Sequence, residues 1–209
     1  MFTKIREVIA EHIKNNLNLY FFLFLAFVAG ISAGAFTVNG LSPVQKKELT
    51  NYLHGFFQLF ENQKVDGNEI LRISLMDNMR QIAILWVLGV TIIGIPFIYI
   101  LIGVRGFITG FTSGFIIEYL GLKGVLFSAM TILPKELIII PCLIALGVNG
   151  INFSMGIIKN KSNKDENKNS LKMNFFAYCF VTLTFSTLIF FGIFVESYIV
   201  PVFIRMTLS

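Results

Sequence analysis

Residues 105–115 read RGFITGFTSGF, and this stretch decides how the chain folds. Gly106, Gly110 and Gly114 follow one another at four-residue spacing, so they lie on one face of a helix. Lipid does not drive helices together by the hydrophobic effect, and glycine allows the close backbone approach that supplies the attraction instead. The stretch therefore predicts a helix-packing face, which contacts either another span of the same chain or another subunit.

The chain around this stretch has the composition of a membrane protein. Of its 209 residues 55% are hydrophobic and only 14% are charged, with a mean hydropathy of +0.74. Soluble domains carry about 25% charged residues, and apolar runs of 18 or more residues indicate membrane spans. The small net charge of +5 fits lysine-rich loops at a membrane better than nucleic-acid binding, so no nucleic acid is expected as a partner.

The apolar runs and the breaks between them predict an all-α polytopic protein with a single integral membrane domain, residues 1–209. We expect about five transmembrane helices, a short re-entrant or interfacial helix and an outer helical hairpin. In chain order these are a cytoplasmic amphipathic segment (1–18), span 1 (19–38), the outer hairpin (40–80), span 2 (82–104), span 3 (106–120), a broken or re-entrant region (121–136), span 4 (137–157), a cytoplasmic loop (159–172) and span 5 (174–200). Pro96 is expected to kink span 2.

The positive charges predict the orientation of the chain. Residues 1–18, Arg105 and the loop 159–172 together hold more than half of the lysine and arginine residues. The positive-inside rule then places the N-terminus in the cytoplasm and the C-terminus outside the cell membrane. A rival interpretation of span 1 is a cleaved signal peptide, because Ala33-Gly34-Ala35 resembles a cleavage site. Gly30 and Gly34 instead continue a ladder of small residues that suits helix packing in lipid.

The outer hairpin carries a candidate partner-binding surface. Ser42-Pro43-Val44-Gln45 predicts a helix start, with a capping box and proline at the first helical position. Apolar side chains then recur at helical spacing, namely Leu49, Tyr52, Leu53, Phe56 and Phe60. This stripe either binds a partner or packs on the second helix of the hairpin or the lipid surface.

Four ionisable residues are expected to meet at the outer face of the membrane, namely Glu118, Lys135, Glu136 and Glu196. Charges near apolar segments are costly and indicate a functional site, although interfacial anchors or a structural ion pair are the simpler interpretation. In this outer-face charged cluster Lys135 would partly neutralise three carboxylates. No nucleophile-and-base motif and no metal-ligand spacing is present, so no catalytic residue, metal or cofactor is expected. Cys142 and Cys179 lie in apolar runs and are expected to be packed free thiols.

Four segments resemble the stage II sporulation protein M family: GLSPVQKKELTNYLHGFF, RGFITGFTSGF, ILPKELIIIP and FVESYIVP, in the same order over nearly the whole chain. The resemblance implies a multi-pass membrane scaffold that anchors two peptidoglycan-degrading proteins during engulfment in endospore formation and has no wall-degrading activity itself. A homo-oligomer is also possible.

The family pattern falls on ten positions, which are Arg105, Gly106, Phe107, Gly110, Gly114, Pro134, Glu136, Pro141, Glu196 and Pro201. This chain has Lys135 where relatives often have histidine, and Ile139 and Ile140 where an acid often precedes the second proline. A titratable pair in that motif is therefore not expected, whereas packing or docking is. Two other classes compete: a transport protein or permease subunit, suggested by Pro96 and the broken region 121–136, and an intramembrane enzyme.

Overall fold

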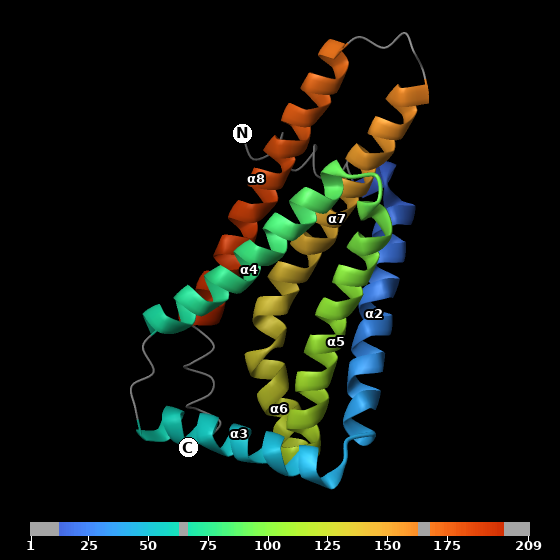
Figure 1. The fold of residues 1–209 in the computed structure, drawn as a ribbon. Coiled ribbons are helices and arrows are strands. Elements are labelled where there is room, and N and C mark those ends of the chain that lie inside the picture. The colour runs from blue at the N-terminus through green and yellow to red at the C-terminus, as the bar shows by residue number, and fades with distance from the viewer. Residues whose placement is uncertain (1–12, 63–66, 163–167, 199–209) are drawn as a thin grey trace.

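The computed structural model describes residues 13–62, 67–162 and 168–198, and every element in these ranges is a helix (Figure 1). The elements are α2 (Leu17–Asn39), α3 (Pro43–Asn62), α4 (Gly67–Val90), α5 (Gly94–Leu120), α6 (Leu122–Thr131), α7 (Leu133–Ser162) and α8 (Lys168–Tyr198). Five of them, α2, α4, α5, α7 and α8, are long and apolar enough to cross a membrane. The predicted class, an all-α polytopic membrane protein, is confirmed.

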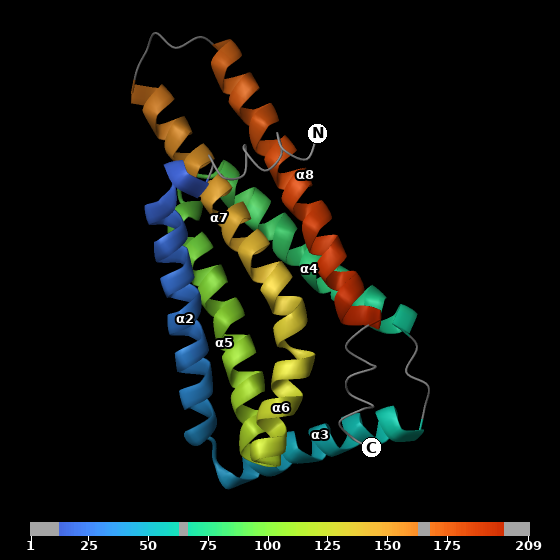
Figure 2. The ribbon, with the colours of Figure 1, turned by 180° about the vertical axis from the view of Figure 1, so that it is seen from behind.

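Two ends of the bundle can be distinguished in Figures 1 and 2. Helix α3 lies across one end, beside the ends of α2, α5 and α6, and we refer to this as the α3 end. At the opposite end lie the last turns of α7 and the first turns of α8, and we refer to it as the α7–α8 end. Most of the predicted amphipathic segment 1–18 lies outside the described residues, as do residues 199–209 with Pro201.

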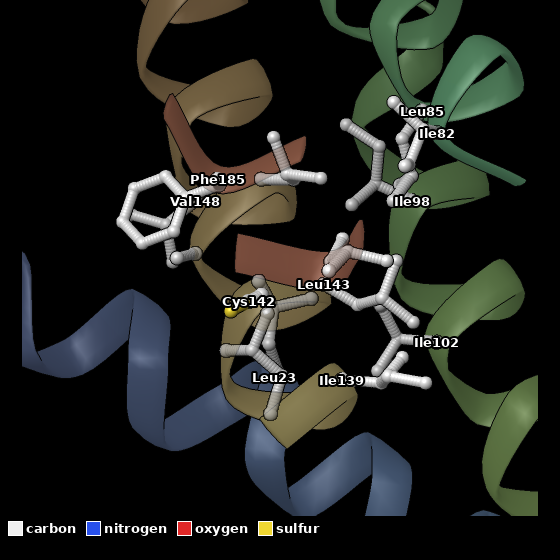
Figure 3. Close-up of a cluster of buried hydrophobic side chains, with 14 of the residues drawn as sticks. Leu23, Ile82, Leu85, Ile98, Ile102, Ile139, Cys142, Leu143, Val148 and Phe185 are labelled. Carbon is white, nitrogen blue, oxygen red and sulfur yellow. The ribbon is translucent and has the colours of Figure 1, made fainter. Parts of the chain in front are cut away.

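Helix α7 is the centre of the core (Figure 3). Its residues 142–150 are all buried, because α2, α4, α5 and α8 cover it from different sides. Leu23, Ile98 and Leu143 come from three of these helices and meet in the same apolar cluster. Cys142 is buried in this cluster and Cys179 is half-buried, and both are free thiols.

The predicted boundary between spans 2 and 3 is wrong. The apolar run 82–104 is not one kinked helix, because the chain turns at Thr91–Ile93 between α4 and α5. The turn is closed by backbone hydrogen bonds from Thr91 N–H to Leu88 O, 3.1 Å, and from Gly94 N–H to Thr91 O, 3.0 Å. A Cβ on Gly94 would lie 1.9 Å from Leu88 O, so only glycine fits. Pro96 then falls in the first turn of α5, where its missing N–H has no helical partner to lose.

The prediction of an outer helical hairpin over residues 40–80 is also wrong. Its first helix exists as α3, but its second half belongs to α4, which runs without a break from Gly67 to Val90 into the bundle. The predicted capping box is confirmed: Ser42 N–H donates to Gln45 Oε1 at 3.0 Å and Gln45 N–H donates to Ser42 Oγ at 3.4 Å. Helix α3 is therefore a single surface helix with a fixed start, not one arm of a hairpin.

Region 121–136 is the first part of a broken span. Gly121, with φ of +61°, reverses the chain at the end of α5, and α6 runs back along α5. A Cβ on Gly124 would lie 2.5 Å from Ile116 O, which shows how closely the two helices approach. Only Ile132 separates α6 from α7. The spans predicted as 137–157 and 174–200 begin earlier, at Leu133 and Lys168, and α7 extends to Ser162, which shortens the predicted loop 159–172.

Candidate functional site

The glycine face of α5 packs against α2 of the same chain. Cβ atoms built on Gly30 and Gly34 would lie 2.1 Å from Gly103 O and from Phe107 O. In return, Cβ atoms on Gly106 and Gly110 would lie 2.2 Å from Phe27 O and 2.1 Å from Ile31 O. Residue numbers at the contacts increase in the same direction along both helices, from Gly30 with Gly103 to Gly34 with Phe107, so α2 and α5 run parallel. At these four glycines the two backbones touch, and no side chain fits between them.

The rest of this face is looser. A Cβ on Gly114 would lie 3.3 Å from Ala35 Cα, a tight but less severe approach. Phe107 and Phe111 stack beside the contact, with ring centroids 6.2 Å apart and planes at 13°. The Ala33-Gly34-Ala35 segment, which resembles a cleavage site, is helical within this interface.

Arg105 does not lie at the end of a span, as the sequence predicted, but in the interior of α5. It is about 16 Å from the first residue of α5 and about 22 Å from the last, at 1.5 Å per residue. Its Nη2 atom donates to Glu136 Oε1 at 2.9 Å, and Glu136 is only 6% exposed. A charge inside a membrane bundle is costly unless it is paired, so each of these two side chains requires the other.

The outer-face charged cluster does not form as one site. Glu136 pairs with Arg105, whereas Lys135, its neighbour on α7, pairs with Glu196 near the end of α8. Glu118, at the end of α5, pairs with Lys46 of α3, with Nζ and Oε1 2.5 Å apart. Each carboxylate therefore has its own cation, and the expectation that Lys135 neutralises all three is wrong. The reason is that Arg105 lies in the bundle and Lys46 reaches over from α3.

The stripe on α3 is divided between two surroundings. Leu49 and Leu53 are half-buried, and Leu53 packs against the small apolar cluster around Ile116 and Phe127 at the ends of α5 and α6. Tyr52 is 77% exposed and points away from the bundle. Phe56 and Phe60 belong to α3, but their side chains lie outside the described part of the structure.

Sequence reasoning missed three polar residues that fasten α4, α7 and α8 to one another. Ser154 Oγ donates to Gly89 O at 2.7 Å and contacts Thr91 O at 3.0 Å, which ties α7 to the turn after α4. Tyr178 Oη donates to Trp86 O at 2.8 Å, and Asn149 Nδ2 donates to Tyr178 O at 3.2 Å. A polar residue inside an apolar run is the signal that could have found them, since it requires a partner there.

Together these features define a class: a polytopic helical membrane protein with a glycine-packed parallel helix pair, a buried ion pair and a surface helix across one end. The sequence profile of stage II sporulation protein M matches residues 22–201. The chain belongs to the stage II sporulation protein M family, and it is a sporulation-related membrane protein. No curated protein and no solved structure matches it significantly.

Proposed function

We propose that this protein is a membrane scaffold that recruits and positions two peptidoglycan-degrading proteins during engulfment in endospore formation. Membership of the sporulation family supports this role. The main structural observation in its favour is the position of α3 across the end of the bundle (Figure 1). The Lys46–Glu118 ion pair and the buried side of the helix hold it across the end of the bundle. A surface helix with an exposed aromatic residue is a suitable docking surface for another protein.

The exposure of the side chains on α3 supports a choice among the predicted docking residues. Leu49 and Leu53 face the bundle and serve to fix α3, whereas Tyr52 is free to contact a partner. Exposed aromatic residues of this kind often supply much of the binding free energy of an interface. Tyr52 is therefore the anchor we assign to the scaffold surface.

Tyr52→Glu is expected to abolish recovery of peptidoglycan-degrading proteins when the tagged protein is purified gently from sporulating cells. An aromatic anchor contributes about 2 kcal/mol or more, so recovery should fall at least tenfold. Gln58→Glu, which adds the same charge at another exposed position of α3, about 120° around the helix from Tyr52, is the matched control and should retain the partners. Equal recovery with both variants would contradict the docking role of Tyr52.

We also propose that the α3 end faces the outside of the cell membrane and the α7–α8 end the cytoplasm. Arg105 lies inside the bundle and therefore no longer counts as a loop charge. The five lysines of residues 159–172 still support this orientation through the positive-inside rule. The test uses a variant that lacks Cys142 and Cys179 and carries one new cysteine at an exposed position. Lys123→Cys should react with an impermeant maleimide on intact protoplasts. Lys159→Cys should react only after the protoplasts are permeabilised. The reverse pattern would invert the orientation.

A transport function is the second candidate. The observation that favours it is a buried ion pair close to one break, because Glu136 lies four residues after Ile132, which separates α6 from α7, and transporters bind solutes at interrupted helices. Solute or ion flux into proteoliposomes containing only the purified protein, lost in Glu136→Gln, would favour transport over the scaffold role.

A further inference from the structure

The exposed side of α4 changes in character along the helix. Its first part carries four exposed ionisable side chains, which are Glu69, Arg72, Asp77 and Arg80. After Arg80 every exposed side chain of α4 is apolar or aromatic, and Ile84, Val87 and Val90 are among them. The charged part of this surface therefore ends at Arg80.

Asp77 and Arg80 lie too deep along α4 to be ordinary interface residues. Arg80 precedes the turn residue Thr91 by 11 positions, which corresponds to about 17 Å of helix. The hydrocarbon core of a bilayer is about 30 Å thick. Glu69, roughly 33 Å from the same turn, is far enough along α4 to reach the opposite surface, whereas Asp77 and Arg80 are not. Charged side chains at this depth require polar partners.

The protein itself does not supply these partners within residues 13–62, 67–162 and 168–198. The ion pairs in these ranges all join other helices, and none involves α4. Asp77 and Arg80 are three residues apart and are neighbours on the helix surface, yet they do not pair with each other. This face of α4 therefore offers a carboxylate and a guanidinium group side by side to a ligand.

We propose that Asp77 and Arg80 bind the headgroup of a zwitterionic aminophospholipid, whose phosphate pairs with Arg80 and whose primary ammonium group pairs with Asp77. The guanidinium group of arginine matches a phosphate with two parallel hydrogen bonds. A primary ammonium group donates hydrogen bonds that a carboxylate accepts. Cβ atoms three residues apart on a helix are about 5–6 Å from each other, which suits two charges joined by a short ethanolamine link.

The acyl chains of such a lipid have an apolar surface to follow. Ile84 and Val87 come four and seven residues after Arg80, so they lie on the same face of α4, and both are exposed. A headgroup at Arg80 lets the chains run along this face toward the turn at Thr91. The site lies on α4, away from Tyr52, and does not depend on the scaffold role.

The two opposite charges distinguish one lipid headgroup from another. Phosphatidylglycerol supplies a phosphate to Arg80 but no cation, so its negative charge is left beside Asp77. Phosphatidylcholine carries a cation, but its quaternary ammonium group has no N–H to donate to the carboxylate. Phosphatidylethanolamine satisfies both side chains.

The test is native mass spectrometry of the delipidated protein in detergent, titrated separately with these three lipids. A hydrogen bond to a charged group changes an affinity by about tenfold or more, so phosphatidylethanolamine should bind at least about tenfold more tightly than the other two. Asp77→Asn should remove this preference and retain binding through Arg80. Arg80→Gln should weaken the binding of all three lipids, since each carries the phosphate.

Glu48→Gln is the matched control, because it neutralises an exposed carboxylate on α3 instead of α4. This variant should bind the three lipids as the parent does. Asp77 and Arg80 are exposed, so their variants should keep the parental thermal unfolding midpoint in the absence of lipid. Equal affinity of the parent for the three lipids, or an unchanged preference in Asp77→Asn, would overturn the proposal.

The occupant of this face can also be identified in native membranes. Met76 lies four residues before Arg80 on the same face and is 63% exposed, so a photoreactive amino acid in its place should crosslink to phospholipid. Crosslinks to a protein instead would show that this face of α4 binds a partner helix, and they would overturn the assignment to a lipid.

Discussion

Gly34→Leu is expected to prevent the bundle from assembling, with a loss of stability of about 3 kcal/mol or more. A Cβ at this position would lie 2.1 Å from the backbone oxygen of Phe107 and 2.7 Å from Phe111 N. Backbone atoms of a helix cannot move aside as a flexible side chain does, so α2 and α5 must separate. The thermal unfolding midpoint of the purified protein in detergent, or its failure to elute as a single species, measures the effect.

Gly103→Ala is the matched control on the same interface. A Cβ there would lie 3.6 Å from Ala26 O, an ordinary contact. Alanine also favours helix over glycine by up to about 1 kcal/mol, so this variant should be as stable as the parent or slightly more stable. A Gly34→Leu protein that unfolds at the parental temperature would show that α2 and α5 are not packed through their backbones.

Arg105→Leu and Glu136→Leu, each alone, are expected to destabilise the protein by about 3–5 kcal/mol, because each leaves a buried charge without its partner. The double variant removes both charges and replaces them with apolar side chains, so it should recover most of this loss. Unfolding free energies of the parent, the two single variants and the double variant in one detergent form the double-mutant cycle that measures the coupling.

The exposed ion pair between Lys46 and Glu118 provides the comparison. Both side chains are partly exposed, and Glu118→Gln should cost no more than about 1 kcal/mol. If single substitutions at Arg105 and Glu136 lowered the free energy of unfolding by no more than Glu118→Gln does, the Arg105–Glu136 pair would be solvated and would not lie in the interior of the bundle.

That residues 106–114 form a helix-packing face could be predicted from spacing alone, because glycines repeated every four residues have few other uses in an apolar helix. Gly30 and Gly34 carried the same signal on α2. The sequence could not predict that these two glycine faces contact each other, because a local pattern contains no information about the partner helix or about the relative direction of the two helices.

The sequence did not predict the boundary between α4 and α5, and the reason is physical. Hydropathy averages over a window, and the turn at Thr91–Ile93 is as apolar as the helices beside it. The error moved Arg105 to a predicted span end and so hid its pairing with Glu136. Gly94 followed by Pro96 was the available signal, since glycine permits the close turn and proline favours a helix start.

The parallel contact of α2 and α5 also has a consequence for biogenesis. Ile31 emerges from the ribosome roughly 80 residues before Gly110, which corresponds to about 4–16 s at 5–20 residues per second. During this interval the glycine face of α2 has no partner from its own chain and is open to other small-residue helices or to insertion chaperones. Slowing translation between residues 40 and 100 would lengthen the period in which α2 can pair wrongly, and synonymous codon changes in that interval alter it without changing the protein.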